Sequence, residues 1–174
     1  MNILVTGGTS TVGKHLKEIL PDAAYISSKE CDLTDIKMVR WLISSYTPNI
    51  VIHLAAKVGG IQDNIAKPAE YFDDNILMNT NILKVSHEYN VKRFIGILST
   101  CIYPDKVDSY PMKEDVMFNG PPTTTNFSYG YAKRAMAVQI EAYNKQYGTK
   151  YNYITPCNLY SEYDNFENDR KMHF

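Results

Sequence analysis

The most constraining feature of the sequence is a glycine-rich turn near its start, which lies between a short apolar run and an amphipathic segment. The apolar run is 3–6, and the turn reads Thr6-Gly7-Gly8-Thr9-Ser10-Thr11-Val12-Gly13. A strand, such a turn and a helix in this order begin a dinucleotide-binding unit, in which the helix N-terminus binds a pyrophosphate. Gly7 permits the tight turn and Gly13 permits close packing of helix on strand. Residues 7–13 are therefore candidate cofactor contacts. Ser10 occupies the position of the usual middle glycine, and a serine fits there only if its φ is negative.

Short apolar runs alternate with amphipathic stretches along the rest of the chain, which indicates βαβ units and a parallel sheet. We expect strands at 3–6, 24–27, 50–55, 94–100 and 151–155. We expect helices over 12–20, 36–46, about 68–90 and 132–147. Residues 104–127, rich in proline and threonine, predict a long irregular segment that is either functional or a plain surface excursion. The expected fold is a Rossmann-like doubly wound parallel sheet in three α/β/α layers.

Composition excludes several classes of protein. The chain has 174 residues and a net charge of −1, from 18 basic and 19 acidic residues, which argues against a strongly basic nucleic-acid binder. No apolar run approaches the length of a membrane span. Cys31, Cys101 and Cys157 form neither a disulfide framework nor a Cys-x-x-Cys metal pair. We therefore expect a reduced, cytoplasmic protein with no structural metal, no nucleic-acid partner and no membrane partner.

The end of the second expected strand bears on the choice of cofactor. NAD-type sites place an acid about 20 residues after the first glycine, where it binds the ribose 2′-hydroxyl. This chain has Ser27-Ser28-Lys29 there, two hydroxyls and an ammonium that suit a 2′-phosphate. The segment favours NADP(H), although the same residues are also compatible with a plain polar turn. Asp32 and Leu33 are expected at the adenine edge.

A tyrosine and a lysine one helical turn apart form a candidate catalytic pair. Tyr129 and Lys133 share a helix face because they are four residues apart. A nearby ammonium, together with a cationic nicotinamide, would lower the pKa of the tyrosine. Ser99 ends the preceding expected strand, on the edge where open α/β sheets bind ligands. Both Tyr129 and Lys133 are also compatible with a solvated helix face.

Five features of the sequence together resemble the extended short-chain dehydrogenase/reductase superfamily. They are the glycine turn, His53-Leu54-Ala55-Ala56, Asp74-Asn75, Ser99 and the pair Tyr129/Lys133. Its members act on nucleotide sugars through a bound nicotinamide cofactor. Within this superfamily, five segments are similar to the GDP-L-fucose synthases. They are residues 55–60, 99–104, 141–149, 158–160 and 164–166. The resemblance implies NADPH-dependent 3,5-epimerisation and 4-keto reduction of GDP-4-keto-6-deoxy-D-mannose, which gives GDP-L-fucose.

The resemblance also implies residue roles. Tyr129 would protonate the C4 oxygen, Lys133 would hold the nicotinamide ribose, and Ser99 would bind the C4 oxygen. Cys101 would be the base that removes the protons beside the ketone, and His173 would return a proton on the opposite face. Further implied cofactor contacts are Leu54, Ala55, Ala56, Leu98, Pro156, Asn158 and Leu159. His53 is expected to make a structural hydrogen bond.

Several alternatives stay open. Related sugar dehydratases carry Asp-Glu where this chain has Thr100-Cys101. The Thr100-Cys101 pair therefore favours proton abstraction without loss of water. A 4-epimerase would need neither Cys101 nor His173. The alternatives are an epimerase or reductase of another nucleotide-linked keto sugar, such as a 6-deoxy-heptose, and a non-catalytic NADP-binding module.

Family members continue into a smaller domain that binds GDP and sugar, and we expect this chain to lack it. They also form homodimers through helices near residues 70–90 and 128–147.

Overall fold

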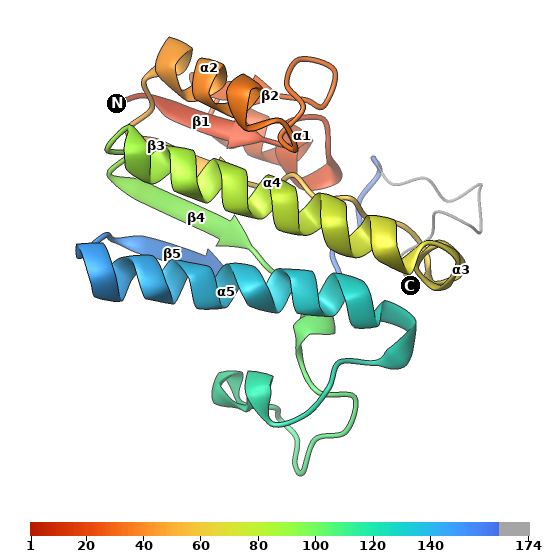
Figure 1. The fold of residues 1–174 in the computed structure, drawn as a ribbon. Helices are drawn as coiled ribbons and strands as arrows, with labels where there is room; N and C mark the ends of the chain where they lie inside the picture. The colour runs from red at the N-terminus through yellow and green to blue at the C-terminus, as the bar shows by residue number, and fades with distance from the viewer. Residues whose placement is uncertain (164–174) are drawn as a thin grey trace.

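A computed structural model of the chain describes residues 1–163. Its centre is a parallel five-stranded sheet with the strand order β2-β1-β3-β4-β5 (Figure 1). The strands are β1 (Ile3–Thr6), β2 (Ala24–Ile26), β3 (Ile50–His53), β4 (Arg93–Ile97) and β5 (Tyr151–Ile154). The chain moves outward from β1 to β2 and then crosses back to β3, so the order reverses between β1 and β3. Ligands bind outside the carboxyl ends of the strands at such a point.

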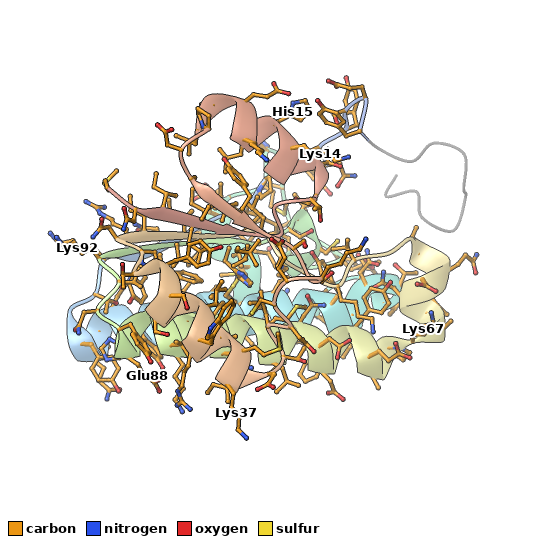
Figure 2. The ribbon with its side chains drawn as sticks, turned by 90° about the horizontal axis from the view of Figure 1, so that it is seen from above. Lys14, His15, Lys37, Lys67, Glu88 and Lys92 are labelled. Atoms are coloured by element: carbon orange, nitrogen blue, oxygen red, sulfur yellow. The ribbon has the colours of Figure 1, made fainter. Side chains whose placement is uncertain are left out.

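Helices cover the two faces of the sheet unequally. They are α1 (Thr11–Ile19), α2 (Ile36–Tyr46), α3 (Ile61–Ala66), α4 (Pro68–Glu88) and α5 (Phe127–Tyr147). α1, which carries Lys14 and His15, lies on one face, and α2, α4 and α5 lie on the other (Figure 2). α4 and α5 run side by side (Figure 1). The layers and the parallel sheet confirm the predicted Rossmann-like fold.

Local sequence signals explain where these helices begin and end. Asp35 caps α2, because its side chain accepts a hydrogen bond from Lys37 N at 2.8 Å. Pro68 occupies the first turn of α4, where its missing N–H is not needed. α5 ends at Gly148, which adopts a left-handed conformation with φ +67°.

The main core lies between the sheet and α2, α4 and α5. Alternate strand residues point toward these helices and are fully buried, as at Leu4, Val51 and Phe94. Gly96 on β4 has no side chain, and a Cβ there would lie 3.2 Å from Met136 and Ile140 of α5. Close packing at this point therefore fixes α5, which carries the candidate tyrosine, against the end of β4.

The observed elements differ from the predicted ones mainly where strands become loops. β3 ends at His53, and β4 ends at Ile97. Ser99 is therefore beyond the strand, as the N-cap of a 3-10 helix, Thr100–Ile102. α3 and two further 3-10 helices, Glu114–Phe118 and Thr124–Asn126, were not predicted because short helices show no apolar period. An isolated bridge between Pro104 and Pro122 closes the base of the irregular segment.

His53 makes the structural hydrogen bonds that the sequence analysis expected. Its Nδ1 lies 2.7 Å from Thr6 Oγ1, and its Nε2 lies 2.9 Å from Asn79 Oδ1. With Oδ1 as the acceptor, Nε2 donates and Nδ1 accepts from the threonine hydroxyl, so the ring is neutral. Burial, followed by the nearby charge of Lys133, lowers the pKa of His53 to about 3. This ring ties β1, β3 and α4 together beneath the carboxyl ends of the strands.

The buried ring predicts that stability falls on acidification. Histidine in the unfolded chain binds a proton below its ordinary pKa of 6.5, whereas His53 in the folded chain binds one only below a pKa of about 3. Between these two pH values the proton therefore favours the unfolded chain. Between about pH 7.5 and about pH 5.5, this group should remove about 1.4 kcal/mol from the free energy of unfolding. Urea unfolding at both values, for wild type and His53→Gln, isolates the contribution. If both proteins lose the same free energy, the ring is not the source.

Candidate active site

A cleft of about 980 Å³ lies at the carboxyl ends of the strands. It collects most of the predicted site, namely Gly7, Thr9, Ser10, Thr11, Val12, Ser27, Ser28, Asp32, Leu33, Leu54, Ala55, Ala56, Leu98, Ser99, Cys101, Tyr129, Lys133, Pro156, Asn158 and Leu159. Gly8, Gly13 and Lys29 are not among its lining residues. His173 is outside the described residues. Segments that follow all five strands thus converge on one cavity with residues of α1 and α5.

The glycine turn has the geometry that its sequence predicts. Gly7 has φ +73°, and a Cβ there would lie 2.7 Å from Ala55 N. A Cβ at Gly13 would lie 2.6 Å from Gly7 O, which explains why α1 can pack so closely on the turn. Ser10 has φ −67°, the negative value that a serine needs at the middle position. Its hydroxyl accepts from Gly13 N at 3.1 Å, so Ser10 is the N-cap of α1.

The floor of the cleft brings Ser99, Cys101 and Tyr129 together. Ser99 Oγ accepts from Cys101 N at 3.3 Å and is also hydrogen-bonded to the Tyr129 side chain. Burial raises the pKa of Tyr129 above its ordinary value, the nearby Cys101 thiol raises this pKa further, and the Ser99 hydrogen bond partly opposes both. A hydroxyl, a thiol and a phenol are therefore within reach of one bound group.

Lys133 lies below Tyr129, one turn along α5. Its Nζ donates to Ile97 O at 2.8 Å and lies 5.9 Å from the centroid of the Tyr129 ring. Burial of this ammonium lowers the pKa of Lys133 to about 8. Burial of the phenol dominates the Tyr129 pKa in this structure, and the Lys133 ammonium is directed to Ile97 O at the end of β4. The expected lowering of the Tyr129 pKa by the ammonium together with a cationic nicotinamide stays a prediction.

Three residues that the sequence analysis missed hold the Ser99–Ile102 turn in place. Asn126 Nδ2 donates to Cys101 Sγ at 3.4 Å. Gly130 allows a close approach, because a Cβ there would lie 2.5 Å from Cys101 O. Arg134, which is 5% exposed, donates through Nε to Ile102 O. Single polar residues near a helix start carry no periodic signal, so only the fold reveals these contacts.

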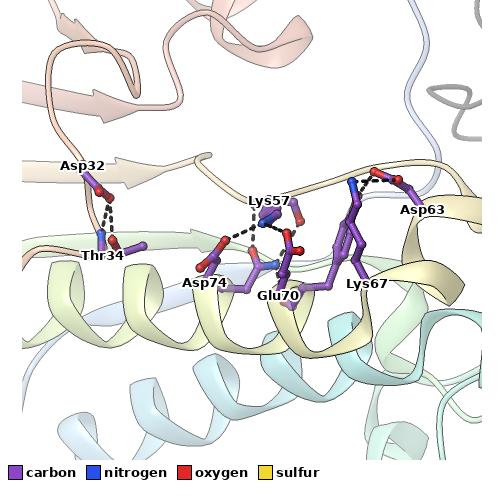
Figure 3. Close-up of polar contacts among 9 residues, drawn as sticks. Asp32, Thr34, Lys57, Asp63, Lys67, Glu70 and Asp74 are labelled. Atoms are coloured by element: carbon purple, nitrogen blue, oxygen red, sulfur yellow. Dashed lines mark hydrogen bonds and ion pairs between the residues drawn. The ribbon is translucent and has the colours of Figure 1, made fainter.

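The loop after β3 forms the opposite wall and is fastened to α4. The amide of buried Asn75 accepts from Lys57 N and donates to Lys57 O, both at 3.0 Å. The Lys57 ammonium also pairs with Glu70 at 2.8 Å and Asp74 at 2.7 Å (Figure 3). Such exposed ion pairs add little free energy, so the buried amide is the main anchor. The Asp74-Asn75 motif thus positions a wall of the cleft.

None of the helices in residues 1–163 is long and apolar enough to cross a membrane. Within the same range, no three His, Cys, Asp or Glu side chains gather as metal ligands would.

The sequence from residue 3 to residue 174 matches the NAD dependent epimerase/dehydratase family. The chain belongs to this family. It is 40% identical over 171 residues to a Drosophila melanogaster protein named "Probable GDP-L-fucose synthase", an alignment covering 94% of this chain and 53% of that protein.

Solved structures of family proteins agree with the fold. A GDP-L-fucose synthetase from Naegleria fowleri bound to NADP has a TM-score of 0.87 and 36% identity, over 99% of this chain and 58% of that one. A GDP-D-glycero-L-gluco-heptose synthase from Campylobacter jejuni, solved in the presence of NADPH, has a TM-score of 0.91 and 29% identity, over 97% and 51%. The chain thus spans about half the length of the relatives it matches.

Proposed function

We propose that this chain is the cofactor-binding and catalytic part of an NADPH-dependent enzyme that epimerises and reduces GDP-4-keto-6-deoxy-D-mannose to GDP-L-fucose. The observation that carries the proposal is the cluster of Ser99, Cys101 and Tyr129 on one cleft floor. The similarity to GDP-L-fucose synthases supports the substrate. Identification of the product that the whole protein makes from GDP-4-keto-6-deoxy-D-mannose and NADPH tests the proposal.

The residues of the cleft fit a dinucleotide cofactor. The left-handed Gly7 and the capped start of α1 form a turn that can accept a pyrophosphate beside backbone N–H groups. Ser27 and Ser28 would receive the adenosine ribose, and Lys133 would hold the nicotinamide ribose. Pro156, Asn158 and Leu159 would border the nicotinamide. The bound NADPH would supply the hydride for the ketone carbon.

For ketone reduction the chain must supply a proton and stabilise developing negative charge. The Tyr129 phenol would donate its proton to the C4 oxygen as the alkoxide forms, while Ser99 hydrogen-bonds the same oxygen. The raised pKa keeps Tyr129 protonated at neutral pH, which suits a proton donor. The ammonium of Lys133, anchored on Ile97 O, would stabilise the phenolate left behind.

For epimerisation the chain must remove and return a proton at carbons beside the ketone. Cys101 as thiolate would take the C–H proton, and the electron pair would move to the C4 oxygen to form an enolate that Ser99 and Tyr129 stabilise. A proton delivered to the opposite face completes the inversion and restores the ketone. By the resemblance, His173 would deliver this proton. Asn126 would hold the Cys101 thiol toward the substrate.

A second candidate is a reductase or epimerase of a GDP-linked 4-keto heptose. The Campylobacter jejuni heptose synthase favours it, because its fold superposes with a TM-score of 0.91. Offering the whole protein both keto sugars and measuring NADPH oxidation distinguishes the two. The sequence identity of 40% to the fly protein, against 29% to the heptose enzyme, supports the fucose route.

We propose that the whole protein also has a smaller substrate domain, because the relatives are about twice as long as this match. On the sheet face that carries α1, Ile52 and Ile95 are only partly buried and Ile154 is 55% exposed, so this face suits further covering segments.

We further propose a cytoplasmic homodimer in which α4 and α5 of one subunit pack against α4 and α5 of the other. Leu77 of α4 and Val138 of α5 are exposed and would lie in this interface. Sedimentation of the whole protein should then give twice the monomer mass.

The serine-rich end of β2 predicts a preference for NADPH over NADH. Ser27 and Ser28 line the cleft, with Lys29 next to them. The Ser28 hydroxyl and the Lys29 ammonium are donors for a 2′-phosphate, whereas the Ser27 hydroxyl already donates to Glu30 Oε2 at 2.8 Å. We expect NADPH to bind at least about tenfold more tightly, about 1.4 kcal/mol. Fluorescence titration of the whole protein with each reduced cofactor gives both dissociation constants. Equal constants would show that these residues do not select the phosphate.

A further inference from the structure

One residue of the cleft belongs to the long irregular segment between β4 and α5 and is not used by the proposed function. Figure 1 shows this segment as an excursion away from the sheet. The bridge between Pro104 and Pro122 closes its base, and the next residue, Thr123, is half-buried and lines the cleft. The excursion therefore returns a hydroxyl to the cleft, where the chain enters the 3-10 helix Thr124–Asn126.

The hydroxyl of Thr123 has a fixed direction. Its Oγ1 donates to Asp105 Oδ1 at 2.8 Å, and Asp105 N donates to Pro121 O at 3.0 Å, which holds the carboxylate at the base of the excursion. A hydroxyl has one proton and two lone pairs, so Thr123 offers the cleft an acceptor and no donor. Because hydrogen bonds in a chain polarise one another, donation to a carboxylate makes this oxygen a better acceptor.

Thr123 lies on the same side of its 3-10 helix as the residue that contacts the proposed base. Asn126 N donates to Thr123 O at 3.0 Å, and side chains three residues apart eclipse in such a turn. Both side chains line the cleft, and Asn126 Nδ2 lies 3.4 Å from Cys101 Sγ. The Thr123 acceptor is therefore at the sugar end of the cleft, near the group that would remove protons from C3 and C5.

The substituents of the keto sugar near the base decide what this acceptor binds. In the proposed reaction Ser99 and Tyr129 bind the C4 oxygen, so Cys101 faces the two carbons beside the ketone. One of these carbons, C3, carries a hydroxyl, and the other, C5, carries a methyl group. Of the two substituents, only the hydroxyl has a proton to donate to an acceptor.

We propose that Thr123, oriented by Asp105, is a specificity-determining residue that accepts a hydrogen bond from the C3 hydroxyl of the incoming keto sugar. It selects this sugar over its 3-deoxy analogue, because a site built to bind a hydroxyl leaves its own polar group unpaired when the hydroxyl is missing. The inference rests on the proposed function and adds a determinant of the substrate class, contributed by the irregular segment.

The test measures deuterium exchange at C5, a step open to both sugars, with the whole protein. Thr123→Val keeps the shape of the side chain and removes its hydroxyl. With GDP-4-keto-6-deoxy-D-mannose we expect kcat/KM for exchange to fall about tenfold, equal to about 1.4 kcal/mol, whereas with the 3-deoxy analogue it stays within about twofold. Thr123→Ser keeps the hydroxyl and should retain the wild-type preference. Thr124→Val is the matched control and should leave both values unchanged, because Thr124 is exposed and is not among the lining residues of the cleft.

A second variant tests the orienting role of Asp105. In Asp105→Ala the Thr123 hydroxyl is free to turn its proton toward the cleft, so kcat/KM with the 3-hydroxy sugar should fall about threefold. Adding Asp105→Ala to Thr123→Val should cause no further loss, since the carboxylate acts through that hydroxyl. Losses that add in the double variant would contradict the orienting role.

The two sugars separate failure of this inference from failure of the proposed function. An equal loss with both sugars in Thr123→Val, no loss with either, or a wild type that exchanges both equally well would overturn the inference alone. Should Thr123→Val fail to fold, the same comparison in Asp105→Ala decides the question. If the wild type exchanges the C5 hydrogen of neither sugar, the proposed function is overturned and the inference with it.

Discussion

Replacing Cys101 with alanine is expected to abolish exchange of the C3 and C5 hydrogens of the keto sugar with solvent. The thiol is the base candidate on the cleft floor, held by Asn126 at 3.4 Å and followed by the turn that Arg134 anchors. Loss of a positioned base costs about 10²- to 10⁴-fold in rate. Deuterium incorporation from D2O, followed by mass spectrometry or NMR, measures this step for the whole protein without requiring reduction.

The reduction step provides the internal control. When the already epimerised 4-keto sugar is supplied, Cys101→Ala should still oxidise NADPH at a measurable rate, because Tyr129 and Ser99 remain. Cys101→Ser keeps the size of the side chain, but the serine hydroxyl is a far weaker acid than the cysteine thiol. This variant should therefore resemble Cys101→Ala. Deuterium exchange at the wild-type rate in either variant would show that another group is the base.

Replacing Tyr129 with phenylalanine is expected to damage both half-reactions. The phenol would donate the proton in reduction and stabilise the enolate in epimerisation, and no other described phenol is hydrogen-bonded to Ser99. A loss of about 10²- to 10³-fold in each rate is the usual cost of removing one such group. NADPH oxidation and deuterium exchange report the two steps separately.

Tyr131→Phe is the matched control for this variant. Tyr131 is two residues further along α5, is exposed, and does not line the cleft, so losing its hydroxyl should leave both rates unchanged. The Tyr129→Phe protein should still bind NADPH, since the phenol oxygen adds little to cofactor affinity. Retention of reduction in Tyr129→Phe would mean that the proton comes from elsewhere.

Much of the fold follows from local signals in the sequence. The glycine turn fixed the first strand, the first helix and the position of the cleft, because Gly7 and Gly13 are needed for a left-handed turn and a close contact. The apolar runs at 50–55 and 94–100 predict the two central strands, and the near-continuous run at 50–55 is typical of a parallel strand that is buried on both faces. The predicted strands extend to 55 and 100, beyond the observed ends at His53 and Ile97. An apolar residue that follows a strand looks the same in the sequence whether it continues the sheet or enters a loop.

The candidate site was predicted by residue identity rather than by geometry. The motifs predict the roles of Ser99, Cys101 and Tyr129 from residue type alone, and the fold places the three side chains together. The sequence could not show that Lys133 is directed to Ile97 O, nor that Glu30 holds Ser27. Both depend on side-chain directions that spacing does not encode.

The proposed reaction is tested most directly by the product that the whole protein makes from GDP-4-keto-6-deoxy-D-mannose and NADPH in D2O. Mass spectrometry and NMR of the product report the number and position of deuterium atoms and the configuration of the sugar. We expect oxidation of NADPH and a GDP-L-fucose that carries deuterium at C3 and C5 and none at C4. A reduced sugar without deuterium at C3 and C5 would contradict the epimerase function, and NADPH left unoxidised would contradict the reductase function.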